Sequence, residues 1–420
     1  MRERGEGVNK MKISIFTPTN NTSYLMDLYE TIKAQDYYEW VIVPNGDNAI
    51  IPEEINNDPR TKVWPYEHEY VGALKAFACS KCEGDVLLEV DHDDLLTEDA
   101  IAETIKAFEE NPEIGFAFSN TANFRNDFEA TERYGDAYGW EYRDFYYKGH
   151  KLDEVVSFDS HPTAASRIWY QPNHLRAWRK TVYDKIGGHN VNMRVLDDQE
   201  LLCRTYLLTD FYHIDKCLYL YRITGNNTWL KYNQEIQDNV VPIHSRHIEQ
   251  MATVWCARND LLALDFGGRF HKKHGVISVD LKDADVNTNL NEEWPFADNS
   301  VGLIIANDIL EHLKDPIHAM SEAHRVLADG GLFLIQVPST DGRGAFQDPT
   351  HISFWNENSF WYYTRSEQAK YIDNTTIRFQ DVVLQTLFPS DWHKQHNISY
   401  VYVHLVAVKG TRRLSGAIGI

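Results

Sequence analysis

An apolar segment that ends abruptly in carboxylates constrains the fold of this chain more than any other feature. Residues 86–90 read Val-Leu-Leu-Glu-Val, and Asp91, Asp93 and Asp94 follow at once. A short run that is apolar on both faces is typical of a strand inside a parallel sheet. Thr97 is predicted to cap the helix that follows. The carboxylates therefore fall at the carboxyl end of a strand, where open α/β sheets bind ligands.

Carboxylates that alternate along an extended segment have two interpretations. Their oxygens suit a hard cation such as Mg²⁺ or Mn²⁺, which can bridge them to a diphosphate. The alternative is a solvated acidic loop in front of a helix, and for an isolated Asp-x-Asp this is the more frequent case because the pattern is short. The rest of the chain decides between them.

Length and charge bound the possible functions. A chain of 420 residues is too long for one ordinary hydrophobic core and predicts two domains. The net charge of −21 argues against a nucleic-acid partner, because such binding depends on Lys and Arg at the phosphates. It permits a nucleotide-sugar ligand where a metal ion supplies positive charge. The composition carries no information on oligomeric state.

Cysteine spacing and hydropathy indicate a cytoplasmic protein. Of five cysteines only Cys79 and Cys82 are close together, and without a second pair we expect reduced thiols and no zinc site. No apolar run approaches the roughly 20 residues of a membrane span. Residues 1–11 lack the apolar stretch of a signal peptide and are expected to be a disordered leader. Residues 410–420 are expected to be a loose tail.

Strand-like and helix-like segments alternate through residues 12–233. The segment KISIFTPTNN at 12–21 and the segment at 40–44 read as strands, and residues 23–34 and 72–80 read as helices. This order predicts a mostly parallel sheet with helices on its faces.

The remaining chain divides into three parts. Between residues 126 and 171 the pattern gives way to aromatic and charged residues, which is typical of a long functional loop. Residues 234–258 are predicted to form a connecting helix. Residues 259–409 show a second strand-helix alternation and are predicted to form the second domain.

Several polar segments of the first domain together resemble the family 2 glycosyltransferases. The matching segments are TPTNN (17–21), EWVIVPNGDN (39–48), EGDVLLEVDHDDLLTEDA (83–100), AWRKTVYDKIGGHN (177–190) and LDDQELLCRTYL (196–207). Each is weak alone, but they follow the order of the family across residues 12–230. The resemblance implies an α/β fold of the GT-A type, an inverting transferase, a nucleotide-sugar donor with UDP favoured, a glycan acceptor of polysaccharide biosynthesis, and Mn²⁺ or Mg²⁺ as cofactor.

The resemblance also implies roles for single residues. Asp93 would be the main metal ligand, Asp91 would hold the metal or the ribose, and Asp198 would be the general base. The implied nucleotide-sugar site comprises Thr17, Pro18, Thr19, Asn45, Asp47, Lys75, Asp91 and His92. The chemistry is consistent: the acceptor hydroxyl must lose its proton as it attacks, and the leaving diphosphate needs its charge neutralised.

Other positions keep two interpretations. Many family members have aspartate where Asn45 stands, and an asparagine can still accept a hydrogen bond from a pyrimidine. Lys75 would approach a phosphate or be a solvated helix lysine. The acceptor-site candidates are His161, His174, Asp197 and Trp140, and for each of them a structural role in the core is the alternative.

The second domain resembles the class I methyltransferases that use S-adenosylmethionine and have a Rossmann-like fold. The matching segments are LLALDFGG (261–268), GVISVDL (275–281), LNEEWPFADNSVGLIIANDILEHLKDP (290–316) and HRVLADGGLFLIQVPS (324–339). The implied cofactor site comprises Asp265, Gly267, Gly268, Asp280, Asn307 and Asp308. His351 would be the base that activates a sugar hydroxyl.

Two departures bear on methyl transfer. Arg269 stands where the family has the second glycine of its Gly-x-Gly turn, and the interval from Asp265 to Asp280 is short for a full helix. The second domain is therefore either a working sugar O-methyltransferase or an inactive scaffold or acceptor-binding module.

Two other classes of protein remain open for the first domain. One is a nucleotidyltransferase, which usually has a Gly-rich basic loop after the first strand, and the other is a non-catalytic binding protein.

Overall fold

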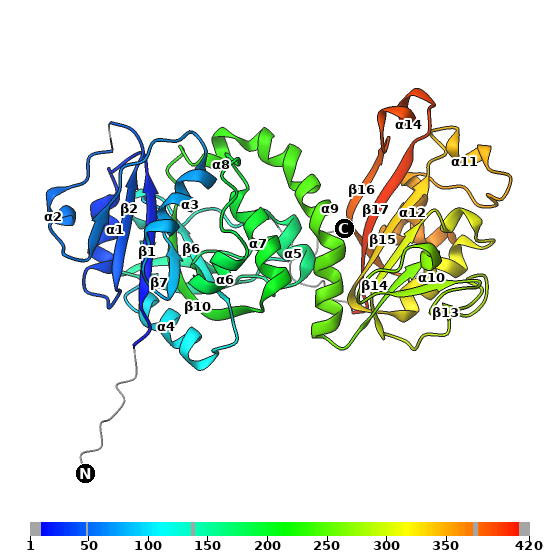
Figure 1. The fold of residues 1–420 in the computed structure, drawn as a ribbon, viewed down its shortest axis with the longest axis horizontal. Coiled ribbons are helices and arrows are strands. Elements are labelled where there is room, and N and C mark those ends of the chain that lie inside the picture. The colour runs from blue at the N-terminus through cyan, green and yellow to red at the C-terminus, as the bar shows by residue number, and fades with distance from the viewer. Residues whose placement is uncertain (1–9, 48, 136–138, 373–376, 411–420) are drawn as a thin grey trace, which may run out of the picture. The chain divides into compact units, whose positions relative to one another are not determined.

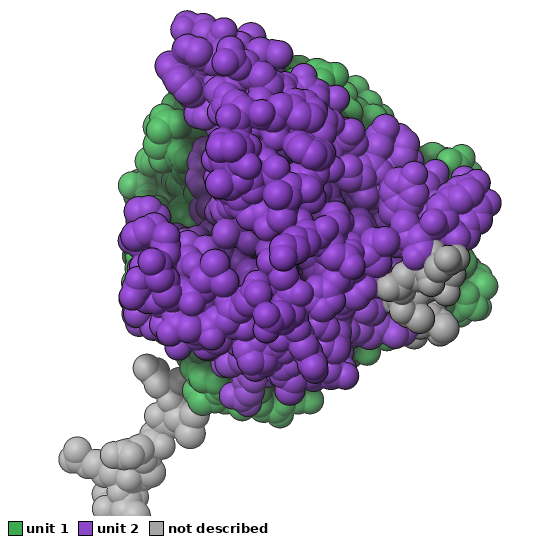
Figure 2. All heavy atoms as spheres, turned by 90° about the vertical axis from the view of Figure 1, so that its right-hand side faces the viewer, with its two compact units in different colours: residues 1–134, 140–160, 164–244 green, residues 135–139, 161–163, 245–420 purple. Residues whose placement is uncertain are grey.

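The computed structural model describes residues 10–47, 49–135, 139–372 and 377–410. The predicted leader at 1–11 and tail at 410–420 therefore lie almost wholly outside the described residues. Two compact units divide the chain, and Figure 2 colours them separately. The first comprises residues 1–134, 140–160 and 164–244, and the second comprises residues 135–139, 161–163 and 245–420.

The first unit alternates strands with helices, as its hydrophobic pattern predicts (Figure 1). Its elements are β1 (Ile13–Thr19), α1 (Leu25–Ile32), β2 (Glu39–Pro44), α2 (Glu53–Asn56), β3 (Thr61–Val63), α3 (Val71–Lys81), β4 (Val86–Glu89), β5 (Leu95–Leu96), α4 (Ala100–Glu110), β6 (Phe116–Phe124), η1 (Asn126–Phe128), β7 (Tyr142–Tyr147), β8 (His150–Val155), α5 (Pro162–Arg167), β9 (Arg176–Arg179), α6 (Lys180–Lys185), α7 (Asp197–Leu208), β10 (Phe211–Arg222) and α8 (Thr228–Lys231).

The sheet of this unit is mixed, with a parallel half that carries the predicted site. Its strand order is β3-β2-β1-β4-β9-β6-β10-β5. β1 pairs in parallel with both β2 and β4, and all three strands are almost wholly buried because apolar side chains predominate on both of their faces. Their carboxyl ends consequently meet at one edge of the sheet.

Two local predictions are wrong. The helix predicted to follow Thr97 begins only at Ala100, because Leu95 and Leu96 first pair with β10, and the Thr97 hydroxyl donates to the Asp99 side chain at 2.7 Å. The segment predicted as an irregular loop between 126 and 171 contains the β7–β8 hairpin, where large aromatic side chains satisfy the strand preference.

The second unit is also built on an α/β sheet, with strand order β13-β12-β11-β14-β15-β17-β16. The pairs from β13 to β15 are parallel, and β17 runs antiparallel to β15 and β16. Its elements are β11 (Leu262–Phe266), η3 (Gly268–Phe270), β12 (Ile277–Asp280), β13 (Val286–Asn287), β14 (Val301–Asn307), η4 (Leu310–His312), α10 (Pro316–Val326), β15 (Leu327–Pro338), α11 (Gly344–Gln347), α12 (Glu357–Thr364), α13 (Ser366–Ala369), η5 (Lys370–Ile372), β16 (Phe379–Leu387), α14 (Asp391–Gln395) and β17 (Tyr400–Ala407).

One long helix, α9 (Asn233–Arg258), covers the segment predicted to connect the domains. The division between the two units falls inside it, between His244 and Ser245. Among the described residues, none of the helices combines the length and apolar character that crossing a bilayer requires. All five cysteines are buried free thiols.

Candidate active site

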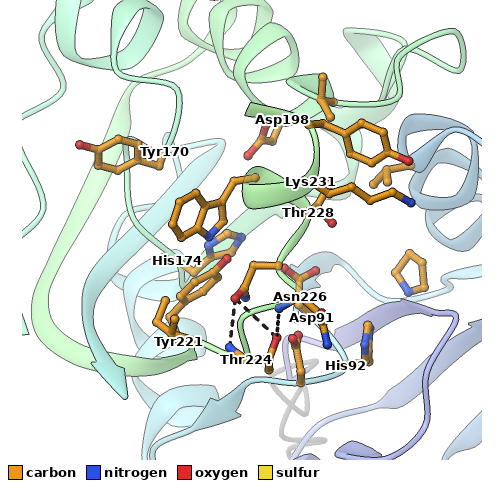
Figure 3. Close-up of a pocket in the computed structure, with 18 of the residues that line it drawn as sticks. Asp91, His92, Tyr170, His174, Asp198, Tyr221, Thr224, Asn226, Thr228 and Lys231 are labelled. Atoms are coloured by element: carbon orange, nitrogen blue, oxygen red, sulfur yellow. Dashed lines mark hydrogen bonds between the residues drawn. The ribbon is translucent and has the colours of Figure 1, made fainter. Parts of the chain in front are cut away.

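A cavity of about 910 Å³ lies at the carboxyl ends of β1 and β4, in the first unit (Figure 3). Its walls also come from the start of α7, the end of β10 and α8. Figure 3 shows Asp198 on one side of this cavity and Asp91 with His92 on the opposite side. The lining includes most of the predicted site residues: Pro18, Thr19, Asn45, Lys75, Asp91, His92, Asp93, His174, Asp197 and Asp198.

Four predicted residues are not part of this lining. Thr17 is fully buried, where its hydroxyl donates to the Val90 carbonyl at 2.7 Å and accepts from the Trp40 indole at 3.0 Å. Asp47 is exposed beyond the end of β2. Two further residues lie elsewhere: Trp140 packs against Phe158 with ring centroids 4.1 Å apart, and His161 belongs to the second unit, 5.0 Å from the Trp255 ring.

Asn45 lines the cavity with its amide already engaged. Its side-chain nitrogen donates to the His68 carbonyl at 3.0 Å, and its side-chain oxygen accepts from the His68 N–H at 3.1 Å. The amide therefore holds the segment before α3 in place. A carbonyl oxygen has two lone pairs, so the side-chain oxygen keeps one for a ligand.

Asp198 is held as a carboxylate by a buried guanidinium. Arg176 Nη1 donates to Asp198 Oδ2 at 2.5 Å, and the Gln199 N–H donates to Asp198 Oδ1 at 2.8 Å. The Arg176 side chain is 1% exposed and that of Asp198 is 21% exposed. Burial alone would raise the pKa of Asp198, but the charges of Arg176 and Lys75 outweigh burial and lower it. Asp198 is therefore ionised near neutral pH and keeps a face open to the cavity.

The neighbouring Asp197 has a different environment. Its side chain is 5% exposed, and its Oδ2 lies 3.6 Å from Lys75 Nζ and accepts no hydrogen bond from a described residue. Burial raises the pKa of Asp197 to about 7, the Lys75 charge opposes this, and the Asp198 charge adds to it. The pKa values of two adjacent carboxylates thus shift in opposite directions, because only Asp198 has a guanidinium partner.

Lys75 is buried and belongs to an ion pair with Glu89. Sequence reasoning treated it as a phosphate ligand or a solvated helix residue, but Lys75 Nζ contacts Glu89 Oε1 inside the protein. Burial would lower the pKa of Lys75, yet the charges of Asp197 and Glu89 raise it well above its ordinary value. The solvated-lysine interpretation is therefore wrong. His174, beside Glu89, is neutral because burial lowers its pKa to about 3 and the Arg176 charge acts in the same direction.

The two carboxylates predicted to hold a metal line the cavity, and the third is structural. Asp94 is fully buried and accepts from the Tyr219 hydroxyl and the Arg222 N–H, both at 2.7 Å. Asp91 and Asp93 are half-buried, and no described residue donates a hydrogen bond to their carboxylates. Burial raises the pKa of Asp91 to about 6, Lys75 opposes this, and the charges of Glu89 and Asp93 add to it. Two unpaired carboxylates at a cavity fit a hard divalent cation.

Sequence reasoning missed several residues of the cavity. These are chiefly aromatic residues and cations: Tyr24, Arg125, Tyr134, Trp169, Tyr170, Arg194, Tyr221, Trp229, Lys231 and Tyr232. Half of them come from α8 with Tyr232 after it, or from the segment before β9, where no short motif marks them. Arg176 was also missed, although an arginine between apolar residues of a strand indicates a buried partner.

The glycine turn predicted to bind the cofactor of the second unit is present. Asp280, the carboxylate predicted to bind the cofactor ribose, already has a charged neighbour. Gly267 has φ +75°, and a Cβ on Gly268 would lie 2.9 Å from the Asp265 carboxyl, so both positions require glycine. Arg269 Nε lies 3.6 Å from Asp280 Oδ2. The guanidinium thus pairs with the carboxylate that the ribose of S-adenosylmethionine would need. Binding of the cofactor ribose by Asp280 would require the Arg269 guanidinium to move away from this carboxylate.

The other predicted residues of the second unit lie at the end of β14 or close to it. Asn307 and Asp308 are exposed there. The short interval between Asp265 and Asp280 holds only the 3-10 turn η3 in place of a full helix, as expected. His351 lies near Glu311 and His312, and the three side chains form a separate cluster.

Two family models match the chain, one in each half. Residues 14–169 match glycosyl transferase family 2, and residues 251–335 match a methyltransferase domain. Residues 14–169 therefore match the family 2 glycosyltransferases, the predicted resemblance to both families is confirmed, and both units have an α/β fold. The match to family 2 ends before Asp198, so the role of this residue is a separate question.

The chain is similar in structure to TarS of S. aureus. Residues 1–349 of TarS align with 17% identity and a TM-score of 0.41, covering 63% of this chain and 76% of that one. The same fragment in complex with UDP-GlcNAc gives 16% identity and a TM-score of 0.42, over 63% and 77% of the two chains. No curated protein matches the chain in sequence.

Proposed function

We propose that the first unit transfers a sugar from a nucleotide-sugar donor to a hydroxyl group of a glycan acceptor, with inversion at the anomeric carbon. The observation that carries this proposal is the position of Asp198 across one cavity from Asp91 (Figure 3), with Asp93 in the lining of the same cavity. Direct displacement needs a base on the acceptor side and charge neutralisation on the leaving-group side. The cavity has a group of each kind.

Asp198 is proposed to take the proton of the acceptor hydroxyl. The ion pair with Arg176 keeps the carboxylate ionised and fixes its orientation, since Oδ2 is held by the guanidinium and Oδ1 by the Gln199 N–H. A fixed base reaches its substrate with little loss of rotational freedom. Removal of one proton leaves an alkoxide-like oxygen that attacks the anomeric carbon as the bond to the diphosphate breaks.

Asp91 and Asp93 are proposed to hold a divalent metal ion, Mn²⁺ or Mg²⁺. The ion would stabilise the negative charge that develops on the leaving diphosphate. Lys231 and Arg194 line the same cavity and are proposed to contact the phosphates. Pro18 and Thr19 at the end of β1, together with Asn45 at the end of β2, are proposed to contact the nucleoside, for which UDP is favoured.

The acceptor is proposed to bind against aromatic faces. His174 is neutral and its ring stacks near Tyr219, with centroids 5.0 Å apart, so it presents an uncharged surface to the cavity. Trp169 and Tyr170 line the cavity beside it. Sugars commonly bind with their apolar faces on such rings.

The experiment incubates the full chain with a panel of nucleotide sugars and measures release of nucleoside diphosphate, with Mn²⁺, with Mg²⁺ and with EDTA. We expect release with one class of donor, loss of release in EDTA and recovery when metal is added back. Asp93→Asn should lower release in the same way as EDTA. Full release in EDTA would overturn the metal assignment. A second reaction contains a nucleoside triphosphate and a sugar 1-phosphate, and release of pyrophosphate in this reaction alone would favour a nucleotidyltransferase.

A further inference from the structure

A cluster of two histidines and a glutamate lies in the second unit, just after β14. Glu311 and His312 belong to η4, and His351 lies in the segment before α12. Backbone hydrogen bonds join the two segments: the N–H groups of Ile352 and Ser353 donate to the Glu311 carbonyl at 2.8 and 3.0 Å. The three side chains are thus held on a common framework of main-chain bonds.

The side-chain geometry is that of a set of metal ligands. One ligand atom from each residue lies within 4.8 Å of the others, and His351 Nε2 is 3.9 Å from Glu311 Oε1. Ligands of a tetrahedral zinc ion lie about 2.0–2.2 Å from it and about 3.3–3.6 Å from one another. The three side chains would therefore have to close by roughly 1 Å around a bound ion.

Both histidines are oriented through the ring nitrogen that would not bind metal. His351 Nδ1 lies 3.0 Å from the Ala345 carbonyl oxygen, and His312 Nδ1 lies 3.2 Å from the Thr350 carbonyl oxygen. A carbonyl oxygen only accepts, so each Nδ1 carries the proton and each Nε2 keeps its lone pair. This arrangement is the usual support of a metal-binding histidine.

Glu311 gives an independent indication of a ligand. The residue is 2% exposed, and neither carboxyl oxygen has a hydrogen-bond partner among the described residues. A buried carboxylate without a partner is costly. A neutral carboxyl would still lack an acceptor for its own proton, whereas a cation would satisfy both oxygens. The buried, unpartnered carboxylate of Glu311 is therefore one of the three possible ligands in the cluster.

We propose that Glu311, His312 and His351 bind a divalent transition-metal ion, with Zn²⁺ as the reference ion. Two imidazoles and one carboxylate suit Zn²⁺, Fe²⁺ or Co²⁺ better than the hard Mg²⁺. Three protein ligands leave a coordination position open, and His312 is only half-buried, so a substrate oxygen can reach the ion. The site follows a parallel strand at its carboxyl end, where ligands of α/β sheets bind. It is independent of the cavity in the first unit.

The test is a titration of the metal-depleted full chain with Co²⁺ in excess Mg²⁺, followed by visible absorption. The excess Mg²⁺ occupies sites that have oxygen ligands alone, so that Co²⁺ does not bind there. Co²⁺ bound by both nitrogen and oxygen ligands has a distinct visible spectrum. We expect one equivalent of Co²⁺ to bind, and Zn²⁺ to displace it. Glu311→Gln and His351→Gln should each weaken Co²⁺ binding by about 100-fold or more.

The matched control is His274→Gln, because His274 is an exposed histidine of the same unit. This variant should bind Co²⁺ like the original chain. Thermal unfolding provides the second measurement: Zn²⁺ should raise the melting temperature of the original chain and of His274→Gln, but not of Glu311→Gln. Absence of Co²⁺ binding in excess Mg²⁺, or equal affinity in all variants, would overturn the proposal.

Discussion

Replacing Asp198 by asparagine tests the proposed base most directly. Asparagine keeps the size of the side chain, and its oxygen can still accept from Arg176, but it cannot take a proton. Loss of a general base typically costs 10²–10⁴-fold in rate, which corresponds to about 2.7–5.5 kcal/mol of transition-state stabilisation. We therefore expect kcat to fall by at least about 100-fold while the affinity for the nucleotide sugar stays within a factor of about three, a change worth less than 1 kcal/mol.

The same substitution also lowers the stability of the fold. Arg176 Nη1 donates to Asp198 at 2.5 Å, and the guanidinium is 1% exposed. A hydrogen bond to a charged group contributes about 1.5–3 kcal/mol and one between neutral groups about 0.5–1.5 kcal/mol. Asp198→Asn leaves the buried Arg176 charge without a carboxylate and offers one oxygen to two donors. It should therefore cost about 3–5 kcal/mol and lower the melting temperature by roughly 6–20 °C. Activity should be measured well below the unfolding midpoint of this variant.

The assay compares Asp198→Asn with Asp197→Asn at saturating donor, using release of nucleoside diphosphate and calorimetric titration of the donor. Asp197 is the matched control because it is adjacent, is an aspartate and lines the same cavity. We expect Asp197→Asn to retain at least a tenth of the original rate, a loss of no more than about 1.4 kcal/mol. Unchanged turnover in Asp198→Asn, or a larger loss in Asp197→Asn, would refute the assignment of the base.

Three further predictions follow from the contacts described above. The rate at limiting metal should fall as the pH drops below about 6, because burial raises the pKa of Asp91 to about 6 and its protonated form binds no cation; a rate that stays constant down to pH 5 would contradict this. Lys75→Met should lower the free energy of unfolding by about 3–5 kcal/mol, because it leaves the 1% exposed Glu89 carboxylate unpaired, and denaturant unfolding should show partial recovery when Glu89→Gln is added. Arg269→Gly should create measurable binding of S-adenosylmethionine by freeing Asp280, and tight binding to the original chain by calorimetry would show that the ion pair is no obstacle.

The fold and the acidic edge of the first sheet could be predicted because they depend on local patterns. The apolar run at 86–90 forms β4, and the polar residues after it line the cavity, since side chains beyond a buried strand must leave the sheet at its end. Asp91 and Asp93 differ from Asp94 for a reason that local sequence does not carry. Asp94 reaches the Tyr219 hydroxyl, which lies on a strand far away in the chain.

The pairing of buried charges could not be predicted, because it depends on strand register. β4 runs antiparallel to β9, and in this register Glu89 lies directly opposite Arg176. The guanidinium thus comes within reach of Asp198 on α7, while Lys75 on α3 pairs with Glu89. The presence of Glu89 in an apolar strand was a signal that a partner exists. Its identity required the three-dimensional arrangement.

The balance of charges supports the proposal that the first unit uses a metal ion. Lys75 neutralises Glu89 and Arg176 neutralises Asp198, so these buried pairs add little net charge to the floor of the cavity. Asp91 and Asp93 have no such partner among the described residues, and a diphosphate that approaches them meets like charges. A divalent cation between the two reverses that repulsion, because it attracts both the carboxylates and the phosphates. Nucleotide affinity should therefore be weak in EDTA and rise steeply with Mn²⁺, and this dependence should disappear in the double variant with asparagine at both positions.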